Sequence, residues 1–192
     1  MREGDDLFFA PGVRFSDVDL GGIRLPEQYR ARIEGFYLRP AGLCTEAGHA
    51  FAAGLLIVST IDFMAGFHHS AEDLPGRAVG ADFREFARRE LRSFGSGNLA
   101  QRLFDDFRNG LSHEARIKCA GEFSFDRPYT VRVVSGRLCI NPAHLLREVE
   151  EALERQMAQL AENAVKRMDA AERLRSLFSR EFGILERARN IG

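Results

Sequence analysis

Apolar residues recur every three or four positions along most of the chain, which is the spacing of amphipathic helices. The first such stretch begins at Pro26, since proline is favoured in the first turn of a helix, and it is expected to stop at Pro40. The second, about 46–67, is apolar on nearly every side and predicts a helix at the centre of a bundle. Two further amphipathic stretches, about 79–91 and 98–111, should pack around it.

A different pattern, the alternation of apolar and polar residues, occupies about 121–140. Together with the turn residues Ser135–Gly136, it predicts a small antiparallel β-hairpin or a three-stranded meander. Asn141 then caps a helix whose apolar spacing continues almost to Gly183. Unbroken, that helix would be about 60 Å long, so we expect it either to bend near 169–175 or to pack its end on a second subunit.

The predicted fold class is mainly α: an up-and-down helical bundle with a small β insertion before a long C-terminal helix. The chain is expected to have two parts. Residues 1–25 are rich in Gly and Asp with scattered Phe, and predict an irregular N-terminal arm that docks through Phe8, Phe9 and Phe15. Residues 26–192 are expected to form a single helical domain with the β-hairpin inserted.

Composition restricts the class of protein further. The 192 residues suffice to bury one core, and the formal net charge of -1 gives no overall basic field of the kind that duplex-DNA binders carry. Three cysteines without CxxC spacing and an N-terminus without a signal-peptide pattern predict free thiols and a cytoplasmic location. The uninterrupted apolar run Ala50–Val58 is far short of the roughly 20 residues of a membrane span. No membrane association is expected.

A polar group interrupts the end of the fourth helical stretch, LFDDFRNGLSHEARI. Arg108 is followed directly by Asn109 and, five positions after the arginine, by His113. An ideal helix turns about 140° over five residues, so the arginine and histidine would diverge. The long arginine side chain, or a local break at Gly110, is needed to bring both groups to one phosphate.

The hexapeptide RNGLSH resembles the signature of the HEPN domains, which is Arg, a polar residue, three to five variable residues and His. The residues that match it are Arg108, Asn109 and His113, and they lie in a helical setting. HEPN domains are all-helical bundles, and the resemblance covers about 26–180 as a pattern of helices. The β-hairpin and the N-terminal arm depart from a minimal bundle and leave the subfamily open.

The resemblance implies a metal-independent endoribonuclease of a defence or toxin–antitoxin type, with RNA as substrate and no cofactor. His113 would act as general base or acid on the ribose 2′-OH and the leaving 5′-oxygen. Arg108 would hold the scissile phosphate, and Asn109 would orient the histidine or bond the phosphate. The products would carry 2′,3′-cyclic phosphate. Because one histidine cannot easily serve as both base and acid, the family's usual arrangement, a homodimer with both motifs in one cleft, is expected.

Two other interpretations of the motif remain open. The first is a non-catalytic HEPN-like module that binds a partner protein, such as an antitoxin, or a nucleotide. The second is purely structural: a polar helix end with Ser112 capping the next turn, and His113 as a satisfied core residue. Spacing alone carries little information, because Arg137 and His144 form another such pair, which we reject since it begins on a strand and crosses a helix start.

Other polar groups give weaker predictions. Asp62, in the apolar second helix, should have a partner because an unpaired buried carboxylate is costly, and Arg108 is the candidate; an ordinary surface position for Asp62 is the alternative. Adjacent His68 and His69 lack a well-spaced third ligand, so no metal site is expected. The arginines of the third helix are interrupted by glutamates and predict a solvated face rather than an RNA-binding one; they are Arg84, Arg88, Arg89 and Arg92.

Overall fold

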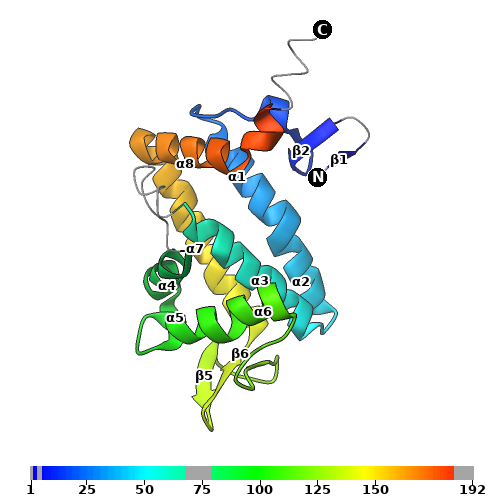
Figure 1. Cartoon of the computed structure of the whole chain (residues 1–192), viewed down its shortest axis with the longest axis vertical. Coiled ribbons are helices and arrows are strands. Elements are labelled where there is room, and N and C mark those ends of the chain that lie inside the picture. Colours follow the sequence, from blue (N-terminus) through cyan, green and yellow to red (C-terminus); the bar gives the residue numbers. More distant parts are fainter. Residues whose placement is uncertain (1, 4–5, 68–78, 184–192) are drawn as a thin grey trace.

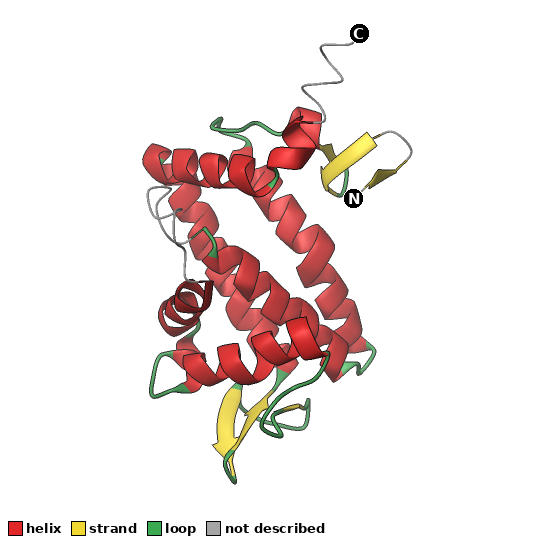
Figure 2. Ribbon diagram, viewed as in Figure 1, coloured by secondary structure: helices red, strands yellow, loops and turns green. Residues whose placement is uncertain are grey.

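The structure is a computed structural model that describes residues 2–3, 6–67 and 79–183 (Figures 1 and 2). Helices dominate it, which confirms the predicted mainly α fold class. Within these residues no helix is both long and apolar enough to cross a lipid bilayer. The loop that carries His68 and His69 lies outside the described residues, so the prediction that it holds no metal stays untested.

The first helical stretch is longer than predicted. Helix α1 (Leu25–Ile33) passes through a π-helical turn, η2 (Glu34–Leu38), into α2 (Arg39–Glu46). In η2 the Arg39 N–H reaches the Glu34 carbonyl, five residues back rather than four. The expected stop at Pro40 is wrong, because the proline falls in the first turn of α2, where a missing N–H is tolerated.

Helix α3 (Ala50–Ala65) is central, as its apolar sequence predicts. It contacts α2, both π-helical turns and the two helices α4 (Val79–Glu90) and α7 (Pro142–Glu162). One stripe is nevertheless uncovered, since Phe51 is 47% exposed and Leu55 is 37% exposed. The expectation of burial on nearly every side therefore fails along this stripe.

The β insertion is a hairpin of β5 (Val131–Val134) and β6 (Arg137–Ile140), paired antiparallel as predicted. A third strand, β4 (Glu122–Phe123), pairs with β6 in the parallel direction, so the alternative of a meander is wrong. Gly54 of α3 permits this arrangement, because a Cβ there would lie 2.2 Å from the ring of Phe123.

The long C-terminal helix is broken, and not where the sequence suggested. Helix α7 ends at Asn163, whose backbone is extended, and α8 (Ala164–Leu177) begins there with the Asn163 side chain accepting from the Lys166 N–H at 3.1 Å. The predicted bend near 169–175 is therefore wrong. Because the break folds α8 back onto the same chain, helix length no longer argues for a second subunit. At its other end α7 is capped by Asn141, as predicted.

Residues 2–3 and 6–17 form regular structure where an irregular arm was expected, whereas 18–24 belong to no helix or strand. Strands β1 (Arg2–Glu3), β2 (Asp6–Ala10) and β3 (Val13–Arg14) make a small sheet, followed by a short 3-10 turn, η1 (Phe15–Asp17). Docking through phenylalanines is confirmed for Phe9 and Phe15, which are buried in a second hydrophobic cluster with α1 and α8, whereas Phe8 is only half-buried.

Figure 1 places these parts relative to one another. The α1–α2 rod, α3 and α7 run alongside each other, while α8 and the N-terminal sheet lie at one end and the β5–β6 hairpin projects from the other. The main core lies between the long helices, where Tyr29 donates from its hydroxyl to Gln156 at 3.2 Å. Burial raises the pKa of Tyr29 well above its usual range.

Candidate functional site

The predicted motif lies on a second π-helical turn. Helix α5 (Leu99–Arg102) passes into η5 (Leu103–Arg108), where the Asn109 N–H reaches the Phe104 carbonyl, and continues as α6 (Asn109–Glu114). Ser112 lies inside α6 and is exposed, so the interpretation of Ser112 as the cap of a following turn is wrong. Both π-helical turns of the described chain pack against α3.

The Arg108 guanidinium contacts three polar side chains. Its Nη2 donates to Asp62 Oδ2 at 2.9 Å, which confirms the predicted partner of that carboxylate. Its Nη1 lies 3.3 Å from His113 Nε2 and 3.3 Å from Asn109 Oδ1. The guanidinium also lies 5.6 Å from the centre of the Phe104 ring. The long arginine side chain thus bridges the angle between the two positions on the helix.

The contact between Arg108 and His113 is compatible with one tautomer of the histidine. Because guanidinium nitrogens only donate hydrogen bonds, Arg108 Nη1 can donate to His113 Nε2 only in the tautomer that carries the ring proton on Nδ1. The imidazole is exposed, whereas the arginine side chain is only 17% exposed. The interpretation of His113 as a buried core residue is therefore wrong: its ring is at the surface, with Nε2 next to Arg108 Nη1.

Gly110 serves packing rather than flexibility. It is buried within α6, and a Cβ there would lie 2.3 Å from the backbone carbonyl oxygen of Arg116. Helix α6 ends with Ala115 in the left-handed region, at φ 53°, and the chain then crosses back so that the Arg116 N–H bonds the Gly110 carbonyl. The predicted loosening at Gly110 is thus wrong: the glycine lets this turn close on the helix beside the motif.

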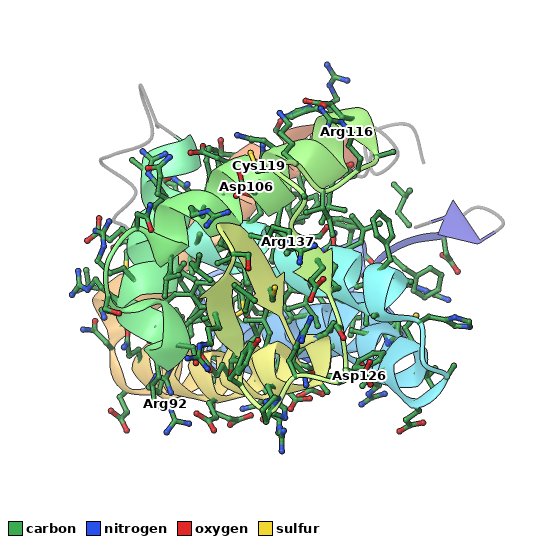
Figure 3. All side chains as sticks on the ribbon, turned by 90° about the horizontal axis from the view of Figure 1, so that it is seen from below. Arg92, Asp106, Arg116, Cys119, Asp126 and Arg137 are labelled. Carbon is green, nitrogen blue, oxygen red and sulfur yellow. The ribbon has the colours of Figure 1, made fainter. Side chains whose placement is uncertain are left out.

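The turn after α6 also carries an exposed thiol. Figure 3 shows Cys119 beside Asp106, with Arg116 on the same side of the molecule. A hydrogen bond with Asp106 raises the pKa of the Cys119 thiol, so the sulfur stays protonated and is a poor nucleophile. All three cysteines are free, as predicted.

A cavity of about 460 Å³ lies next to Arg108 and Asp62. Its other walls come from Tyr37 of η2, from α3 and from α8, which contributes Ser176. His113 is not part of its lining, so the arginine stands between the histidine and the cavity. Sequence reasoning missed the contribution of Tyr37 and Ser176, because both residues are far from the motif along the chain.

The other predicted groups do not join the site. On α4, Arg89 pairs with Glu85 at 3.0 Å, and beyond it Arg92 pairs with Glu151 at 2.6 Å, which fits the predicted solvated face. Arg84 departs from that prediction, because it is half-buried and lies 5.3 Å from the centre of the Phe104 ring, which Arg108 also approaches. Arg137 lies on β6 at the lower face of the molecule (Figure 3). Among the described residues no group of three or more His, Cys, Asp or Glu is placed to hold a metal ion.

Comparison with models of protein families, with curated proteins and with solved structures finds no match for this chain. The resemblance to HEPN domains therefore rests on the motif and its helical setting, and the site is interpreted from its own geometry.

Proposed function

We propose that the protein is a metal-independent endoribonuclease whose site is formed by Arg108, Asn109 and His113. The observation that carries this proposal is the convergence of Arg108 Nη1 and His113 Nε2 to 3.3 Å at the surface. A guanidinium paired with an unprotonated imidazole is the minimum needed to hold a phosphate and remove a neighbouring proton. The resemblance to HEPN domains supports the same chemistry.

The proposed reaction is a transesterification. A substrate phosphate draws Arg108 Nη1 away from the histidine and so frees His113 Nε2, which takes the proton of the ribose 2′-OH. The 2′-oxygen then forms a bond to phosphorus as the bond to the 5′-oxygen breaks, and the leaving oxygen needs a proton from a second acid. Asp62 holds the other edge of the guanidinium, and Asn109 is placed to bond the phosphate.

The second acid is proposed to be His113 of another copy, in a homodimer. Phe51 and Leu55 follow one another along α3 at a spacing of four residues, and Ser59 and Asp62 continue the same face to the site. A second copy seated on this exposed apolar stripe would cover it and bring two motifs together. We expect a dimer at micromolar concentration by light scattering.

A negative charge placed on the exposed apolar stripe of α3 tests whether that stripe forms the proposed dimer interface. Phe51→Glu should give a monomer and abolish cleavage, whereas Val165→Glu, at a more exposed apolar position on α8, should remain dimeric. A wild-type protein that is monomeric at micromolar concentration would contradict the composite site.

Cleavage of total RNA in EDTA tests the function itself. Wild type should cleave, and His113→Ala should lose activity by about 10²–10⁴-fold, the usual range for general acid–base catalysis. His144→Ala is the matched control, because His144 lies on α7 outside the cluster, and it should retain full activity. Equal activity of His113→Ala and wild type would overturn the assigned mechanism.

The second candidate is a non-catalytic binding module. It is favoured by the Asp62 carboxylate, which already occupies one edge of Arg108 and reduces its capacity for phosphate. Absence of cleavage by wild type, combined with retained nucleotide binding, would select it. We also propose a cytoplasmic location, which rests on the three unpaired cysteines. An antitoxin or other protein partner and a role in defence are proposed from the resemblance to HEPN domains.

A further inference from the structure

The cavity beside Arg108 has the size and chemistry of a ligand site. At about 460 Å³ it falls within the range of pockets for small molecules and mononucleotides. Its mouth is bordered by Ser176 and Leu177 of α8, both exposed. Since the same guanidinium contacts His113 on its other side, a ligand whose phosphate sits at the motif would project its remaining part here.

One wall of the cavity is aromatic. Tyr37 and Phe63 lie nearly parallel, with ring centres 6.4 Å apart and an angle of 20° between planes, and Phe67 adjoins them at 5.0 Å from Phe63. Behind this wall Tyr29 is stacked on Phe63 at 5.8 Å and is fully buried, so the rings are held in place by the core. Rigid, near-parallel rings favour a planar ligand that stacks on them.

Two polar groups of α3 beside this wall can accept hydrogen bonds, and the cavity is also lined by the guanidinium groups of Arg108 and Arg173, which donate. The Ser59 hydroxyl donates to the Leu55 carbonyl at 2.9 Å, which leaves its oxygen lone pairs facing other partners. In Asp62, Oδ2 accepts from Arg108, whereas Oδ1 is buried and has no hydrogen-bond partner in the part of the chain that the structure describes. Acceptors beside an aromatic wall suit a base with amino or ring N–H groups.

A larger cavity elsewhere in the described chain does not suit an anionic ligand. It measures about 620 Å³ between α2 and α7, and its lining includes four carboxylates, from Glu34, Glu46, Glu150 and Glu154. A phosphate would be repelled there, whereas the cavity beside Arg108 has a cation at the end facing the motif.

We propose that the cavity formed by η2, α3 and α8 is a nucleobase subsite, which stacks one base of a single-stranded RNA on Tyr37 and Phe63 while its phosphate lies on Arg108. This inference rests on the proposed function, because it takes the phosphate of RNA as the group held by Arg108. It adds a binding role for Tyr37 and a requirement for an unpaired base.

A non-cleavable probe separates this inference from catalysis. A short 2′-fluoro oligonucleotide containing 2-aminopurine lacks the 2′-OH needed for cleavage, and its fluorescence falls when the base stacks. Wild type should quench it on binding. Tyr37→Ala should weaken binding by about 5- to 150-fold, the range for loss of one stacked base, whereas Tyr37→Phe should retain it. Tyr129→Ala, outside the cavity on the β insertion, is the matched control.

A second variant guards against misfolding. Ser176→Trp changes an exposed residue at the mouth and should block the probe without disturbing the core, as judged by circular dichroism. Unchanged affinity and quenching in Tyr37→Ala and Ser176→Trp would overturn the subsite, even if wild type cleaves RNA. Quenching that depends on both positions supports the subsite, even if wild type cleaves no RNA and the proposed nuclease function fails.

Discussion

Arg32 and Arg108 both lie near aromatic rings, yet their surroundings differ. Around Arg32 are rings: its guanidinium carbon lies 4.5 Å from the centre of Phe178, 5.1 Å from Phe9 and 5.6 Å from Phe63. Its Nη1 donates to the Phe9 backbone carbonyl. Arg108 instead contacts a carboxylate, an amide and an imidazole. The first arginine fastens the N-terminal sheet to the helices, and the second gathers groups that handle protons.

The difference shows which arginine is a candidate for chemistry. Burial lowers the pKa of Arg32, and its hydrogen bond is made to a backbone group that cannot exchange protons at ordinary pH. One partner of Arg108 is the exposed imidazole of His113, and histidine side chains in general exchange protons near neutral pH. Partial burial of an arginine is therefore no sign of function by itself; the nature and exposure of its partners decide.

The largest expected effect concerns Arg108. Arg108→Ala should lower the rate of RNA cleavage by about 10²–10³-fold, the usual loss when one group that stabilises developing charge is removed. Arg116→Ala is the matched control, because this neighbouring arginine is exposed and pairs with Glu114 at 2.6 Å. Initial rates on one labelled RNA measure both. Similar losses of cleavage rate in the two variants would mean that the rate depends on the total positive charge of the surface and not on the contacts of Arg108.

At Arg32 we expect a substitution to change the stability of the fold rather than a rate of RNA cleavage. Arg32→Ala should lower the free energy of unfolding by about 1–3 kcal/mol, since the Phe9 carbonyl loses its donor. Urea denaturation measures this, and proteolysis near the N-terminal sheet should accelerate. Arg39→Ala, at an exposed arginine on the same rod, should change stability little. If Arg32→Ala is as stable as wild type, the cluster of rings does not fasten the sheet.

A smaller and more local effect is expected at Gly110. Gly110→Ala should lower the free energy of unfolding by about 1–3 kcal/mol, at the low end if the turn shifts, because the new methyl meets the Arg116 carbonyl. Gly42→Ala, on α2 with no atom within 4 Å of its Cβ, should instead raise stability by about 0.5–1 kcal/mol. Thermal denaturation of both variants distinguishes them. A stabilising Gly110→Ala would show that the close approach does not matter.

Much of the fold could be predicted because apolar spacing reports helices directly. The central position of α3 and the Asn141 cap were visible in the sequence, and so was the pairing of Asp62 with Arg108, since a carboxylate in an apolar helix requires a partner. The break at Asn163 was missed because the apolar period continues across it, so that only the asparagine itself marked a new cap.

The π-helical turns and the cavity could not be predicted from the residues that form them, because both depend on contacts between distant parts of the chain. The π-helical turns depend on packing against α3 rather than on residue preference, and they decide where Tyr37 and Arg108 lie. The cavity brings together residues from η2, α3 and α8, and periodicity within one helix carries no information about such contacts. For the site, the sequence therefore predicted the motif and its carboxylate partner, but not the aromatic wall.

We propose that Arg108 and His113 cleave RNA through attack by the 2′-oxygen. Mass spectrometry of the ends formed when wild type cuts a defined RNA in EDTA tests it most directly. We predict 2′,3′-cyclic phosphate on the upstream fragment and a 5′-hydroxyl on the downstream one, with neither formed by His113→Ala. Ends carrying a 5′-phosphate, or the same ends formed by His113→Ala at the wild-type rate, would contradict the account.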